Sequence, residues 1–130
     1  MAAFEIKNSG LTLEIGGGIF TVYPDDADYI EKVERFSREA QRMSTEFSGM
    51  TEGISDKIRE VCAFCLNSID ELLGEGASEK IFGDQHIGMM MCLEVLTYIK
   101  VESEQYMTAS RQRIRQMGSN REQRRKAQKK

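Results

Sequence analysis

The chain is poor in the residues that most often carry catalysis and metal binding. Its 130 residues include one histidine (His86), one proline (Pro24) and three cysteines (Cys62, Cys65 and Cys92). The odd cysteine count, and an N-terminal sequence without an apolar signal core, argue against a secreted disulfide framework. No apolar run approaches the roughly 20 residues needed to cross a bilayer. We therefore expect a cytoplasmic protein that does not bind a membrane.

The cysteines and the histidine are the only candidates for metal or redox chemistry. Cys62 and Cys65 have CxxC spacing, and Cys92 and His86 could complete a set of four zinc ligands. The pair lies in a continuous helical pattern, without a second CxxC or a turn around it, so we interpret the thiols as buried core residues. His86 follows Asp84, and no nucleophile motif accompanies it, which favours a solvated residue in the first turn of a helix over a general base. The sequence predicts no enzymatic activity, no cofactor and no metal.

Charge is divided unevenly along the chain. Residues 1–110 carry a net charge of −11 and residues 111–130 a net charge of +8, which together give −3. The basic residues at the very end are Arg121, Arg124, Arg125, Lys126, Lys129 and Lys130. This end could solubilise the chain, dock on an acidic protein or on the body of a neighbouring copy, or bind nucleic acid. Nucleic acid is the least favoured partner, because no aromatic residue for base stacking follows Tyr106.

The hydrophobic period changes near Pro24. Before it, apolar residues alternate from Phe4 to Val22 around Gly16–Gly18, which predicts two or three short strands and a hairpin turn. After it, apolar spacings of three and four predict helices. We expect the first helix to begin at Asp25 or Asp26 and end at Ser48–Gly49, the second to run from Thr51 or Ser55 to Gly74, and the third to begin at Asp84.

The predicted fold is therefore α+β and mainly helical, with an N-terminal β-hairpin packed on about three α-helices. In the last helix, one apolar stripe comprises Ile87, Met91, Val95 and Tyr98, widened by Met90, Leu93 and Leu96. From Arg111 onward the periodicity is lost. We expect residues 1–117 to form a single domain and residues 118–130 a basic, flexible, disordered tail.

The segment between the second and third helices carries the clearest packing signal. Gly74 and Gly76 suit the positive φ of a helix end and the following turn, and Ser78 can open one further helical turn. Ile81 and Phe82 would anchor this turn on the core. Three consecutive methionines, Met89–Met91, cannot all face one core, so at least one should point outward. The predicted partner-binding residues are Ile81, Phe82, Met89, Met90 and Met91.

The order of elements from residue 4 to residue 105 resembles that of small tail assembly chaperones of long-tailed phages and prophages of Gram-positive bacteria. The resemblance rests on the run from Ile69 to Gly83, on the N-terminal strand region and long first helix before it, and on the apolar helix after Asp84 that contains Leu93 and Leu96. It implies a non-enzymatic protein of the bacterial host cytoplasm. Such a protein binds the tape measure protein and helps recruit tail tube subunits during virion morphogenesis.

Two other functions remain open at this point. One is a small nucleic-acid-associated regulator that uses the basic end, which salt-dependent DNA binding would favour. The other is a different phage morphogenesis factor, such as a head scaffold or a connector subunit, which stable ring formation would favour. The resemblance transfers no residue as a functional site, because it rests on the order of elements rather than on a chemical motif.

Overall fold

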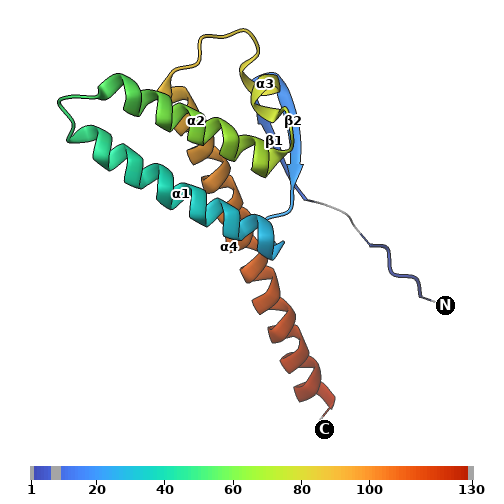
Figure 1. Ribbon diagram of the computed structural model, residues 1–130. Coiled ribbons are helices and arrows are strands. Elements are labelled where there is room, and N and C mark those ends of the chain that lie inside the picture. The colour runs from blue at the N-terminus through green and yellow to red at the C-terminus, as the bar shows by residue number, and fades with distance from the viewer. Residues whose placement is uncertain (1, 7–9, 129–130) are drawn as a thin grey trace.

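A computed structural model describes residues 2–6 and 10–128. The strands and helices are β1 (Leu11–Ile15), β2 (Gly18–Val22), α1 (Ala27–Ser48), α2 (Ile54–Leu73), α3 (Ala77–Phe82) and α4 (Met89–Gln128). Helices α1 and α2 lie side by side, α4 crosses behind them, and the hairpin and α3 lie together at one end of α2 (Figure 1). This confirms the predicted α+β fold of an N-terminal hairpin on three main helices, with α3 as an additional short helix.

The hairpin follows the predicted alternation. β1 and β2 pair antiparallel, with Leu13 opposite Phe20 and Ile15 opposite Gly18, so a two-residue turn connects the strands. Leu13 and Phe20 face the core, while Glu14 and Ile19 face solvent. A third strand is absent from the described residues: the segment of residues 2–6 has no regular structure, and Phe4 and Ile6 are exposed. That segment has no neighbouring strand to satisfy its backbone, so alternation alone was insufficient there.

Helices α1 and α2 form an antiparallel pair. Asp26 caps α1, as predicted, with its side chain accepting hydrogen bonds from the backbone N–H groups of Asp28 and Tyr29. The rings of Phe36 and Phe64 meet edge to face between the two helices, with centroids 6.0 Å apart. The start of α2 differs from the prediction, because the N-cap is Gly53 rather than Thr51 or Ser55.

An ion pair joins the end of α1 to the start of α2. The Lys57 ammonium, largely buried, contacts the carboxylates of Glu46 and Glu60. The hydrogen bond that Lys57 donates to the Glu46 carboxylate raises the pKa of Lys57 and lowers the pKa of Glu46. The stem of Lys57 can therefore pack on the core while its charge remains paired.

The turn between α2 and α3 has the predicted form. Gly74 and Gly76 both adopt positive φ, and α3 begins one residue before Ser78. Asp70 of α2 accepts a hydrogen bond from the backbone N–H of Ser78 at 2.8 Å, which satisfies one free donor of the short helix. Ile81 and Phe82 are both buried, as an anchor requires.

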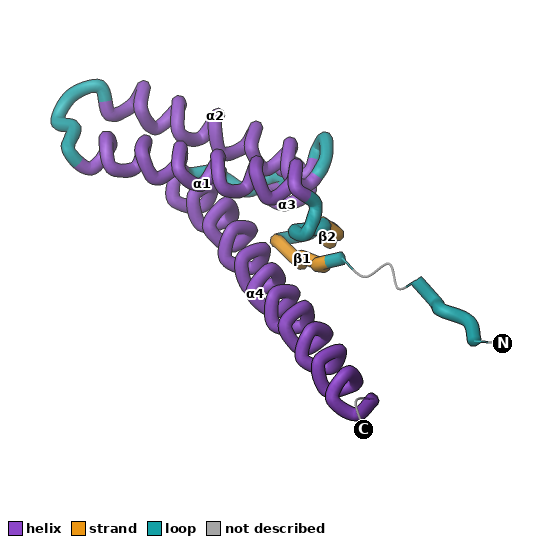
Figure 2. Tube along the Cα trace, turned by 90° about the horizontal axis from the view of Figure 1, so that it is seen from below, coloured by secondary structure: helices purple, strands orange, loops and turns teal. Residues whose placement is uncertain are grey.

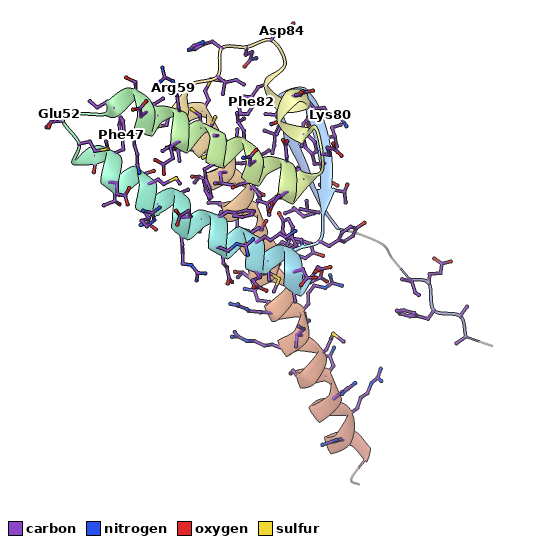
Figure 3. All side chains as sticks on the ribbon, in the orientation of Figure 1. Phe47, Glu52, Arg59, Lys80, Phe82 and Asp84 are labelled. Atoms are coloured by element: carbon purple, nitrogen blue, oxygen red, sulfur yellow. The ribbon has the colours of Figure 1, made fainter. Side chains whose placement is uncertain are left out.

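Helix α4 begins later than predicted, and its most buried stripe is shifted from the predicted one. Asp84 and His86 lie in the loop before it, so the prediction that Asp84 caps this helix is wrong, as is the first-turn position of His86. Asp84 is exposed at the outer end of this loop (Figure 3). The buried residues of α4 are Cys92, Leu96, Ile99 and Ser103, while Tyr98 is 40% exposed. Of the predicted stripe, Leu96 is buried and four further residues pack partly buried against the core: Ile87, Met91, Leu93 and Val95. The most buried face is therefore shifted by about one residue from the predicted one.

A side-chain hydrogen bond fixes where α4 crosses α1. The Tyr29 hydroxyl lies 3.0 Å from Ser103 Oγ, which is buried among the two helices. Burial raises the pKa of Tyr29, although the bond to Ser103 acts in the opposite direction. The pair supplies a partner for a hydroxyl that would otherwise be unsatisfied in the core.

Beyond residue 110, α4 leaves the body and continues as a single helix to Gln128 (Figures 1 and 2). We call residues 111–128 the arm. The prediction of a disordered tail from residue 118 is therefore wrong as far as Gln128. The glutamine, lysine and arginine residues that remove apolar periodicity are themselves good helix formers, and the arm extends a helix already nucleated in the body. Among the described residues, no helix is long and apolar enough to cross a membrane.

Candidate partner-binding site

The three cysteines occupy the interface between α2 and α4. Cys65 and Cys92 are fully buried and Cys62 is half-buried, and all three are free thiols. This placement confirms that they pack in the core. Burial raises the pKa of Cys65 to about 11 and that of Cys92 to about 12, so both stay protonated at neutral pH. Within the described ranges, no three His, Cys, Asp or Glu side chains are arranged to hold a metal ion.

We expect the free energy of unfolding to fall as the pH rises above about 9. The unfolded chain loses its thiol protons near that pH, whereas folded Cys65 and Cys92 keep theirs until about 11 and about 12. The unfolded state therefore binds fewer protons in this window, and rising pH stabilises it. Urea denaturation at a series of pH values measures the decline. A Cys65→Ser/Cys92→Ser variant should show a shallower decline, and identical slopes would exclude the thiols as its cause.

The predicted partner-binding residues do not form one exposed surface. Ile81 and Phe82 are 5% and 3% exposed, so they belong mainly to the core. Met89 and Met91 are partly buried against that core, and Met90 is 60% exposed. The expectation that at least one methionine points outward is confirmed for Met90. Phe82 lies on the body side of the loop that leads to α4 (Figure 3).

A groove that the sequence did not reveal runs between α1 and α4. Three adjoining hollows share lining residues, so they form one continuous depression along the two helices. Its apolar residues are Ile30, Val33, Ala40, Leu93, Leu96 and Met107. Its polar and charged residues include Glu34, Ser37, Arg38, Gln41, Ser44, Thr97, Lys100 and Glu104. We call it the α1–α4 groove.

The α1–α4 groove has the dimensions of a helix-binding site. Its α1 wall extends from Ile30 to Ser44, which corresponds to about 21 Å at 1.5 Å per residue. Met90 precedes Leu93 by three residues and Thr97 by seven, so it lies on the face of α4 that forms the other wall. Apolar side chains flanked by polar ones suit an amphipathic helix laid between two others. The exposed methionine thus extends the apolar surface at one end of the groove.

The basic residues of the chain end lie on the arm. Arg121, Arg124 and Arg125 are exposed along the helix. Lys129 and Lys130 fall outside the described residues, and the side chain of Lys126 is likewise not described. The arm therefore presents the predicted basic surface on a regular helix that projects from an acidic body.

These features define a small, mainly helical α+β protein with a grooved acidic body and a projecting basic helix. Residues 17–128 match the family model described as a family of unknown function, DUF6673, and the chain belongs to that family. The matched region runs from the hairpin turn to the end of α4, so the family pattern includes the arm. Comparisons with curated proteins and with solved structures give no significant match.

Proposed function

We propose that the protein is a phage or prophage tail assembly chaperone that binds the tape measure protein and helps recruit tail tube subunits. The observation that carries the proposal is the α1–α4 groove, a helix-sized depression in which apolar residues are flanked by polar ones, with an exposed methionine on the α4 face at one end. A tape measure protein is long and helical, so its amphipathic segments suit this groove. The resemblance in the order of elements from residue 4 to residue 105 supports the same function.

The mechanism follows from the chemistry of such a groove. A helical segment buried there removes its apolar face from water, which lowers its tendency to aggregate before tube subunits polymerise around it. Flexible thioether side chains such as Met90 can adapt to several segments of similar pattern. The polar rim allows release, because only part of the bound segment is desolvated. We therefore expect reversible binding of repeated sites along one elongated partner.

We expect Thr97→Arg and Met90→Glu each to weaken the complex with a tape measure protein by about tenfold or more. Thr97 is exposed on the groove wall, so arginine fills the groove, while a charge at residue 90 opposes desolvation. The measurement is co-expression with the tape measure protein encoded nearby, followed by pull-down and titration. Gln105→Arg is the matched control, because Gln105 is exposed on the same helix and does not line the groove. Equal binding by all three variants would contradict the assignment of the binding site to the α1–α4 groove.

A nucleic-acid-associated regulator is the second candidate, and the arm is the observation that favours it. Arg111, Arg113 and Arg115 lie on the arm together with the three arginines near its end, and all are exposed. Binding of this kind would weaken steeply as salt rises, because each neutralised phosphate releases counterions. If the protein leaves the tape measure protein unbound but retains DNA in moderate salt, this function replaces the chaperone proposal.

A further inference from the structure

The arm carries two apolar residues that the described part of the chain leaves mostly exposed. Ile114 is 66% exposed and Met117 is 63% exposed. Ile114 and Met117 lie on the same face of α4 as the buried residues Ile99 and Ser103, because the spacing between them is that of a helix. Ser110 lies on this face between the two pairs. The face of α4 that packs on α1 and α2 inside the body therefore continues along the arm without a partner (Figure 2).

Arginines surround this apolar pair. Arg111 lies three residues before Ile114, and Arg113 and Arg121 lie four residues before and after Met117. Residues three and four apart are neighbours on a helix surface, so each apolar side chain has guanidinium groups beside it. The matching surface should be a small apolar hollow bordered by carboxylates.

A hollow of this kind lies in the body between the hairpin and α4. We call it the hairpin groove; its volume is about 350 Å³, and its apolar lining comes from Ile15, Phe82, Met91, Val95 and Tyr98. Glu14 of β1 and Glu94 of α4 are also in its lining, and both are exposed. No lysine or arginine is among the described residues that line it. The lining of the α1–α4 groove, in contrast, mixes Arg38, Lys100 and Arg111 with Glu34 and Glu104, so it offers a basic helix no acidic surface of one sign.

The arm cannot fill the hairpin groove of its own chain. Tyr98 of that groove and Ile114 of the arm lie on the same continuous helix, 16 residues apart. At 1.5 Å per residue they are about 24 Å apart along the axis, and the helix would have to break for them to meet. An arm seated in this groove must therefore belong to another molecule.

We propose that the arm of one copy docks in the hairpin groove of a second copy, with Ile114 and Met117 on the apolar lining and the flanking arginines facing Glu14 and Glu94. Charge complementarity selects this occupant, because the body (residues 1–110) has a net charge of −11 and the arm (residues 111–128) has seven Lys/Arg and one Glu, a net charge of +6. Each copy presents one arm and one groove, so the contact can be exchanged within a dimer or passed on to further copies. The proposal concerns contact between copies and does not depend on the proposed chaperone function.

Sedimentation of the full-length protein over a range of concentrations tests the self-association. A contact of one helix with one hollow is a small protein–protein interface, and such interfaces are usually weak. We therefore expect a dissociation constant on the order of 10 µM. Ile114→Glu/Met117→Glu should weaken it by about tenfold or more, because charge opposes desolvation of the contact. Glutamate keeps the helix propensity of the arm, and circular dichroism checks the fold. A wild-type protein that stays monomeric at about 200 µM would overturn the proposal.

Charge reversal identifies the two surfaces. Arg113→Glu/Arg121→Glu places acidic side chains on the arm, and Glu14→Arg/Glu94→Arg places basic ones on the groove, so each variant alone should be monomeric. Mixed in equal amounts they should associate again, because each reversed surface meets an opposite charge on the other variant. The matched control is Arg35→Glu/Arg59→Glu, which makes the same charge change at exposed residues outside the arm and should associate like the wild type. A mixture that remains monomeric, or a control that dissociates, overturns the assignment.

Discussion

Replacing Gly16 with alanine is expected to lower the free energy of unfolding by about 3 kcal/mol. Gly16 is the first residue of the hairpin turn and has φ +56, whereas Gly17 is not in the positive region, as in a type II′ turn. An alanine side chain there is strained by the left-handed backbone conformation, and its Cβ would also overlap the backbone carbonyl oxygen of Ile81. The carbonyl belongs to α3 and cannot rotate away as a flexible side chain could. Thermal and urea denaturation measure the loss.

Gly83→Ala is the matched control for that experiment. Gly83 has φ +55, nearly the same as Gly16, but no atom lies within 4 Å of the position its Cβ would take. The control should therefore lose only the conformational cost of about 1 kcal/mol. The difference between the two variants measures how tightly the hairpin turn presses on α3. Equal losses would show that this close contact does not contribute to stability.

The hairpin was predictable because its signals are local. Alternating apolar residues assign Leu13 and Phe20 to the same face, and a glycine turn fixes their register without information from the rest of the chain. The ends of α1 were equally predictable from the sequence, since Asp26 and Gly49 are favoured cap residues and both act as caps. The turn after α2 was predicted from its glycines for the same reason.

The start of α4 was not predictable from local signals. Asp84 is an acceptable N-cap, yet the chain remains a loop until Met89. Whether the helix starts after Asp84 or at Met89 depends on where Ile81 and Phe82 pack α3 against the body, and thus on long-range packing. Of the predicted stripe Leu96 is buried, and Met91 and Val95 pack partly buried beside Cys92 and Ile99.

The candidate site was predictable only in part, because grooves arise from helix crossing. The sequence indicated that one methionine would be exposed, and Met90 is. It could not indicate that α1 and α4 cross so that Ala40 and Leu96 line a common depression. A signal for the crossing was present in Tyr29 and Ser103, a polar pair at otherwise apolar positions, but their sequence separation of 74 residues hid it. The exposed pair Ile114 and Met117 was likewise hidden by the surrounding charge.

Replacing Phe82 with alanine should destabilise the protein by about 3 to 5 kcal/mol, and Ile81→Ala by about 2 to 5 kcal/mol. Both residues are nearly inaccessible, and α3 is too short to persist without them, so the cavity adds to the lost burial. Ile19→Ala provides the control: Ile19 is 73% exposed on β2, and its truncation should change stability by less than about 0.5 kcal/mol. Urea denaturation of the three variants gives the comparison.

Phe82→Leu separates the contribution of Phe82 to the stability of the core from its contribution to the lining of the hairpin groove. Leucine retains most of the buried volume, so the loss of stability should stay below about 1.5 kcal/mol. Phe82 also forms part of the lining of the hairpin groove, and the smaller side chain deepens that groove beneath Met91 and Val95. The variant should therefore fold normally, while the dissociation constant of its self-association differs from that of the wild type. If Phe82→Ala melts like the wild type, α3 is not held on the core through this residue, and the hairpin groove cannot have the lining inferred for it.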